Sequence, residues 1–146
     1  GVFDCGNPNP TGLISAKALK NKKNKLKTVC DHYLSPQFVG RMILDNPQIY
    51  LEDYLQFRKL FVKCTHTIVV TQEENENLSE LTKNTKGEYI VKVPTNLKYN
   101  HLGIKLYKRD EGVKGWKKEN CNILESNILY DVPVELLDYE KDYLLV

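Results

Sequence analysis

The sequence predicts an α+β fold, and three patterns of residues indicate it. Two stretches are typical of strands: 26–34, where Thr28 and Val29 lead to Asp31-His32, and 62–70, which is rich in β-branched residues. Between them, residues 36–61 carry apolar side chains at helical spacing. After Gly87 the apolar and polar residues alternate, which favours further strands. A chain of 146 residues is long enough to bury one modest core.

The two helices between the strands have recognisable starts. Ser35 followed by Pro36 is typical of an N-cap and a first helical residue, and it predicts a helix over 36–45. Pro47 can begin a second helix that reaches residue 61. We therefore expect two helices inserted between the strands.

A capping box predicts the helix that follows the second strand. Thr71 and Glu74 have the spacing of an N-cap and an N3 residue, so this helix begins near Gln72. The predicted order is therefore strand, two helices, strand, helix. Further strands are expected within residues 88–94, 102–109 and 113–124.

We expect one compact unit made of two parts. Residues 1–86 would hold a basic arm and the strand–helix core, with 14–27 forming either a short helix or an irregular arm. Residues 87–146 would form a β-rich extension packed on that core, and 143–146 would end it as a last strand or a docked tail.

The four cysteines, at positions 5, 30, 64 and 121, include no Cys-x-x-Cys pair. In a chain of this length that pattern predicts reduced thiols and a cytoplasmic protein. The sequence has no apolar run of about 18 residues, so we expect no membrane partner.

The net charge of +2 is unevenly distributed along the chain. Residues 1–34 carry six Lys or Arg against two Asp or Glu, and residues 83–118 carry ten against three. Residues 119–146 carry one against seven. Basic segments of this kind suit a polyanion such as DNA. A solvated lysine-rich surface explains the charge equally well.

Candidate DNA-binding residues lie in both basic segments. Residues 17–27 contain six lysines and no aromatic residue, so they can neutralise phosphates but cannot stack on bases. Residues 103–120 mix aromatic with basic side chains, which suits stacking on bases, although any half-buried hairpin shows similar alternation. The predicted DNA-binding residues are Lys20, Lys22, Lys23, Lys25, Arg41, Lys108, Arg109, Trp116 and Lys117.

Asp31, His32 and Asn75 form a candidate catalytic set. The first two end the first predicted strand, and Asn75 lies at the start of the helix after the second. Carboxylate and amide oxygens suit Mg²⁺ or Mn²⁺, and a histidine can act as a base near neutral pH. A hairpin followed by a helix would hold these groups rigidly against a phosphate. The set predicts metal-dependent phosphodiester hydrolysis.

Asp31-His32 followed by "HTIVVTQEEN" at 66–75 resembles the ββα-metal, or HNH, endonucleases in their Asp-His…Asn variant. The resemblance implies a ββα-metal nuclease core in which His32 is the general base and Asp31 and Asn75 bind Mg²⁺ or Mn²⁺. His66 takes the middle position, usually Asn in the family, which braces the base. The resemblance also implies a DNA endonuclease of phage or mobile-element origin, of homing or restriction type. A homodimer would suit double-strand cutting.

Two other interpretations stay open. Cys30, His32, Cys64 and His66 form a near-repeat that could hold one zinc ion in a non-catalytic nucleic-acid-binding module, although Cys-x₂₋₄-Cys spacing is absent. Alternatively, the Asp-His pair is only the polar end of a strand in a structural or interaction protein, and Asn75 is a surface residue of the helix.

Overall fold

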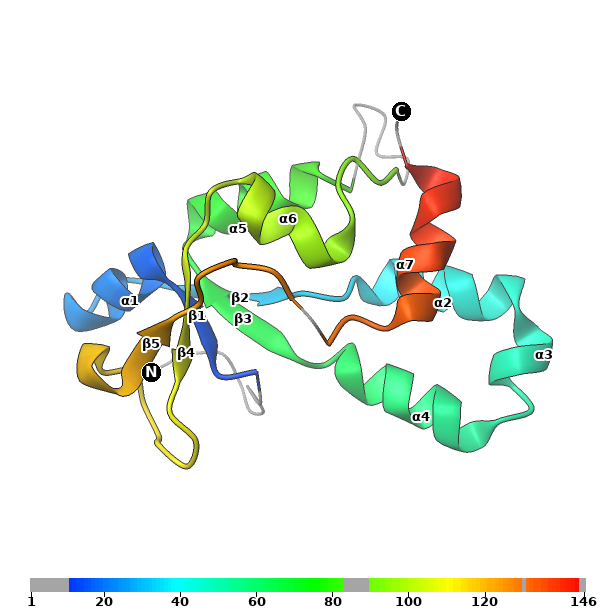
Figure 1. The fold of residues 1–146 in the computed structure, drawn as a ribbon, viewed down its shortest axis with the longest axis horizontal. Helices are drawn as coiled ribbons and strands as arrows, with labels where there is room; N and C mark the ends of the chain where they lie inside the picture. The colour runs from blue at the N-terminus through cyan, green and yellow to red at the C-terminus, as the bar shows by residue number, and fades with distance from the viewer. Residues whose placement is uncertain (1–10, 83–89, 130, 145–146) are drawn as a thin grey trace.

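The computed structural model describes residues 11–82, 90–129 and 131–144. Its centre is a five-stranded sheet with the strand order β2-β3-β1-β4-β5 (Figure 1). The strands are β1 (Leu13–Ser15), β2 (Val29–His32), β3 (Thr67–Val70), β4 (Leu106–Arg109) and β5 (Cys121–Ile123).

Strand β1 joins the two halves of the sequence. It pairs in parallel with β3 and antiparallel with β4, while β2 pairs antiparallel with β3. One sheet therefore draws strands from both sides of Gly87. The sequence did not predict β1, because its three residues are all buried and show no alternation.

The two faces of the sheet are covered differently. On one face, α1 (Ala16–Lys23) packs Ala18 and Leu19 against Ile14 and Val69. The other face carries the larger core and is covered at one end by α5 (Gln72–Glu80) and α6 (Lys98–His101) (Figure 1). Of the two alternatives for residues 14–27, the basic helix is therefore the correct one.

The insertion between β2 and β3 contains three helices, not the predicted two. They are α2 (Pro36–Asp45), α3 (Pro47–Tyr50) and α4 (Tyr54–Lys63). The predicted second helix is divided because Asp53 begins a new one, its Oδ1 accepting a hydrogen bond from the Gln56 amide at 3.1 Å. Helix α4 also continues into the predicted strand, so β3 begins at Thr67 rather than near residue 62.

The predicted caps are confirmed. Ser35 Oγ accepts a hydrogen bond from the Phe38 amide at 3.3 Å at the start of α2. At the start of α5, Thr71 Oγ1 accepts from the Glu74 amide at 3.1 Å, and Glu74 Oε1 accepts from the Thr71 amide at 2.9 Å. Local capping chemistry therefore sets both helix starts, as the sequence indicated.

The segment after Gly87 is mixed rather than β-rich. Strands β4 and β5 match two of the predicted strands, but the prediction missed α6 and α7 (Val134–Glu140). The described residues of this segment also form three 3₁₀ turns, namely η1 (Thr95–Leu97), η2 (Lys118–Asn120) and η3 (Lys141–Tyr143). Of the predicted strand 88–94, residues 88 and 89 lie outside the described part, and Val91 forms an isolated bridge with Leu144. No helix within the described ranges is long and apolar enough to cross a membrane.

Candidate functional site

Asp31 lies on β2 and faces the layer formed by α5 and α6. It pairs with Ile68 of β3 and is only 9 % exposed. The Tyr99 hydroxyl donates a hydrogen bond to Asp31 Oδ2, and Lys98 Nζ lies 3.7 Å from the same oxygen. Both partners come from α6, so this buried carboxylate is already neutralised inside the protein.

Glu74 is a second buried carboxylate near Asp31. Its Oε1 accepts hydrogen bonds from Ser15 Oγ at 2.5 Å and from the Thr71 amide. Burial raises the pKa of Tyr99 well above its usual value, and the negative charges of Asp31 and Glu74 raise it further. The Tyr99 hydroxyl therefore stays protonated and remains a donor. We call Ser15, Asp31, Glu74, Lys98 and Tyr99 the Asp31 cluster.

His32 points to the opposite face of the sheet. Consecutive side chains alternate across a strand, and His32 is exposed while Asp31 is buried. The His32 ring is held by a 3.0 Å hydrogen bond between its Nδ1 and the Cys64 carbonyl. Asn75 lies half-buried on the first turn of α5, beside Glu74. The predicted base and the predicted carboxylate ligand are therefore separated by the sheet itself.

The residues around Asp31 do not fit a divalent ion in this arrangement. The carboxylate oxygen that would bind the ion faces the Lys98 ammonium, whose charge opposes a cation. Within residues 11–82, 90–129 and 131–144, no three His, Cys, Asp or Glu side chains are grouped as metal ligands would be. Metal binding at Asp31 would require Lys98 and Tyr99 to give up their contacts.

The zinc interpretation fails at Cys30, which is disulfide-bonded. A disulfide sulfur is not the thiolate that zinc needs. The expectation that all the cysteines are reduced is wrong at this position, whereas Cys64 and Cys121 are buried free thiols. Burial raises the pKa of the Cys64 thiol, which further disfavours its thiolate form.

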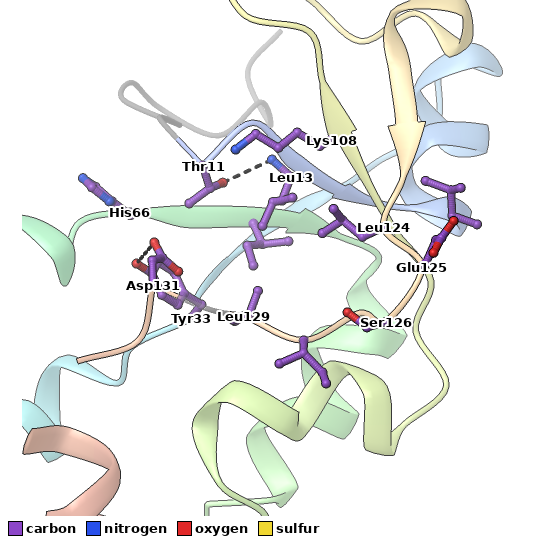
Figure 2. Close-up of a pocket in the computed structure, with 13 residues that line it drawn as sticks. Thr11, Leu13, Tyr33, His66, Lys108, Leu124, Glu125, Ser126, Leu129 and Asp131 are labelled. Atoms are coloured by element: carbon purple, nitrogen blue, oxygen red, sulfur yellow. Dashed lines mark hydrogen bonds between the residues drawn. The ribbon is translucent and has the colours of Figure 1, made fainter. Parts of the chain in front are cut away.

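His66 lines a cavity of about 690 Å³ together with Tyr33, Lys108 and Asp131 (Figure 2). The floor is apolar and includes Leu13, and the Tyr33 hydroxyl donates to Asp131 Oδ2 at 3.0 Å. Burial lowers the pKa of His66, the Asp131 charge partly offsets this shift, and Lys63 lowers the pKa further. The His32 ring is held by the Cys64 carbonyl, whereas His66, the predicted brace of the base, lines this cavity.

The two basic segments of the sequence meet beside α1. They line a groove of about 690 Å³, which we call the α1–Trp116 groove. The groove brings together four predicted DNA-binding residues, Lys20, Lys23, Trp116 and Lys117. The remaining lining residues are Ala16, Leu19, Tyr107, Lys118 and Glu119.

Arg109 and Trp116 form a stacked pair at this groove. The Arg109 guanidinium carbon lies 4.3 Å from the centre of the indole ring, a distance typical of a cation–π contact. Trp116 and Tyr107 are half-buried against the small core under α1. Their packing fixes the rings in place while leaving part of each surface open.

The other predicted DNA-binding residues are placed in different ways. Lys22 belongs to α1, and Lys25 follows it with a left-handed backbone angle φ of 57°. Lys108 lines the Tyr33 cavity instead of the groove. Arg41 belongs to α2, which lies at the opposite end of the molecule from α1 (Figure 1).

Sequence reasoning missed Tyr33, Lys98, Tyr99 and Asp131. Lys98 and Tyr99 belong to a four-residue helix that shows no periodicity long enough to detect. Asp131 contacts Tyr33 across 98 positions of the chain. Only Tyr33 carried a local signal, because it directly follows Asp31-His32.

No family model matches the chain, and no curated protein and no solved structure matches it.

Proposed function

We propose that this protein binds DNA in the α1–Trp116 groove. The observation that carries the proposal is the convergence of two basic segments that are far apart in the sequence. Lys20 and Lys23 come from the first, Lys117 and Lys118 come from the second, and all four line one groove with Trp116. Lysines at such a site neutralise phosphates and release counterions.

The aromatic residues favour DNA over a general polyanion. Bases can stack on exposed aromatic rings, and each stacked base contributes about 1–3 kcal/mol. Tyr107 and Trp116 line the groove together with the two sets of lysines, and the Arg109 guanidinium stacks on the indole. A merely solvated lysine surface needs no aromatic residues among its lysines.

The test uses Trp116, the only tryptophan in the chain, as an intrinsic probe. Titration with single-stranded DNA and with duplex DNA should change Trp116 fluorescence, with affinity falling as salt rises. The logarithm of the affinity changes by about 0.7–0.9 per neutralised phosphate for each tenfold change in salt. The double variant Lys20→Gln/Lys23→Gln should therefore bind more weakly, with a salt slope reduced by about 1.5.

The matched control is Lys92→Gln/Lys141→Gln, which removes the same charge from exposed lysines outside the groove. It should leave the affinity and the slope close to those of the wild-type protein. Equal weakening by both double variants would show that net charge, rather than the groove, attracts DNA and would refute the proposal. Absence of a fluorescence change at saturating DNA would do the same.

Metal-dependent DNA cleavage is the second candidate. The favouring observation is the order of elements, because β2 and β3 form an antiparallel pair that α5 follows directly. This is the framework expected of an HNH nuclease. The ion pair of Asp31 with Lys98 speaks against a metal in the present arrangement.

A plasmid assay with Mg²⁺, Mn²⁺ and chelator in parallel decides the second candidate. If the protein is a nuclease, His32→Ala should abolish nicking while leaving Trp116-detected DNA binding intact. Nicking by the variant at the wild-type rate would show that His32 is not the base. Lack of nicking by the wild-type protein with either metal would remove this candidate and leave the binding proposal unaffected.

A further inference from the structure

Helix α4 has an apolar face that nothing in the described chain covers. Its inner face packs Phe57 and Leu60 on the large core. Leu55 is 67 % exposed, and Phe61 is 59 % exposed although its ring stacks on that of Phe57, with 6.2 Å between the ring centres. Tyr54 and Val62 belong to the same exposed stripe, because residues three, four and seven positions apart share one side of a helix.

Further exposed apolar residues lie on and between the helices just before α4. Seven of the ten large hydrophobic residues that are exposed in the described part of the chain fall between positions 44 and 62. We call them the α4 patch, and they are Leu44, Ile49, Leu51, Tyr54, Leu55, Phe61 and Val62. The helices that carry them, α2 to α4, extend away from the sheet (Figure 1).

The area of the patch matches one side of a protein interface. With roughly 180 Å² per large apolar residue, the observed exposures amount to roughly 800 Å². A stable interface buries about 800 Å² on each partner. Contiguous apolar patches of this size are uncommon on monomers and mark interaction sites.

The shape of the surface suits a second copy of the same chain. A groove of about 660 Å³ runs beside the ridge of α4 and is bordered by Leu55 and Val62 on one side and by Pro133 and Glu135 on the other. A two-fold axis presents the same surface on both partners, so each copy must offer both a ridge and a groove. Helix α4 offers the two side by side.

The charges on α4 select the orientation. Glu52 and Asp53 lie at its start, Arg58 and Lys59 lie at its middle, and Lys63 lies in its last turn. Antiparallel pairing of two copies places the acidic start of each helix near the basic end of the other, which is electrostatically complementary. We propose that the α4 patch is the interface of a homodimer in which the two α4 helices pack antiparallel to each other.

Sedimentation velocity or light scattering over a range of protein concentrations tests the dimer. The wild-type chain should shift from monomer to dimer, and Leu55→Glu and Phe61→Glu should each raise the dissociation constant at least tenfold. Ile123→Glu is the control, because Ile123 is a comparably exposed apolar residue on β5. Circular dichroism and thermal unfolding show whether each variant is folded.

Charge exchange tests the orientation. Glu52→Lys and Lys59→Glu should each weaken the dimer, and the double variant should restore it because both pairs are then reversed. A wild-type protein that stays monomeric at all concentrations overturns the proposal. A dimer that Leu55→Glu and Phe61→Glu leave intact also overturns it. Equal dissociation constants for the single and double charge variants overturn the antiparallel arrangement.

Discussion

Tyr99 donates a hydrogen bond from its hydroxyl to the carboxylate of Asp31, which lies 68 positions earlier in the chain. Tyr99 is completely buried, and the Lys98 ammonium approaches the same carboxylate oxygen. These contacts link α6 to the edge strand β2 and neutralise the charge of the buried Asp31 carboxylate. It also occupies the oxygen that a metal ion at this position would need.

Removal of Lys98 should destabilise the protein strongly. Lys98→Met leaves the buried Asp31 charge with only the Tyr99 hydroxyl, and loss of one partner of a buried ion pair costs about 3 kcal/mol. Chemical denaturation followed by circular dichroism measures this free energy of unfolding. The double variant Asp31→Asn/Lys98→Met should be more stable than the sum of the two single losses predicts, because the unpaired charge is gone. Strict additivity would show that the pair does not interact.

Ser15 should matter more than an ordinary helix cap. Its Oγ accepts a hydrogen bond from the Ala18 amide at 3.0 Å and donates to Glu74, so it joins the starts of α1 and α5. Ser15→Ala should cost about 2 kcal/mol, because a cap is lost and a buried carboxylate loses a donor. Ser35→Ala removes a cap alone and should cost about 1 kcal/mol. Equal losses in the two unfolding experiments would contradict the role of the Ser15–Glu74 contact.

The environment of His66 makes stability depend on pH. Burial lowers the pKa of His66 in the folded protein below its ordinary value of about 6.5. The unfolded chain therefore binds a proton first as pH falls, so stability is lost below about 6.5 until the folded pKa is reached. NMR titration of the His66 ring should give a pKa below 6.5, and His66→Gln should reduce the loss of stability between pH 7 and pH 5. A pKa above 6.5 would mean that the Asp131 charge outweighs burial.

DNA binding in the α1–Trp116 groove should not depend on a metal. The groove is lined by lysines and aromatic residues, with Glu119 as its one acidic residue. Chelator should therefore leave the affinity measured by Trp116 fluorescence unchanged at constant ionic strength. A loss of affinity that Mg²⁺ restores would place a metal between protein and DNA and would favour the nuclease proposal.

The cysteines show where a sequence pattern can mislead. The spacing of the four cysteines predicted reduced thiols, whereas Cys30 is disulfide-bonded. The pattern held for Cys64 and Cys121, which are buried among apolar residues. Pairing depends on which two sulfurs the fold brings together, and spacing along the chain does not contain that information.

Local chemistry determined the features that the sequence predicted correctly. Capping residues set the starts of α2 and α5, and the β-branched residues of 67–70 formed β3. These interactions join residues only a few positions apart, so a short window of sequence contains them in full.

Only the tertiary structure decided what surrounds each candidate residue. Pairing of β1 with both β3 and β4 brings the two basic segments to one groove. The packing of α6 on β2 places Lys98 and Tyr99 in contact with the Asp31 carboxylate. Because side chains alternate along β2, His32 lies on the other face of the sheet. These contacts join residues tens of positions apart, and their free energy depends on the closure of the whole sheet.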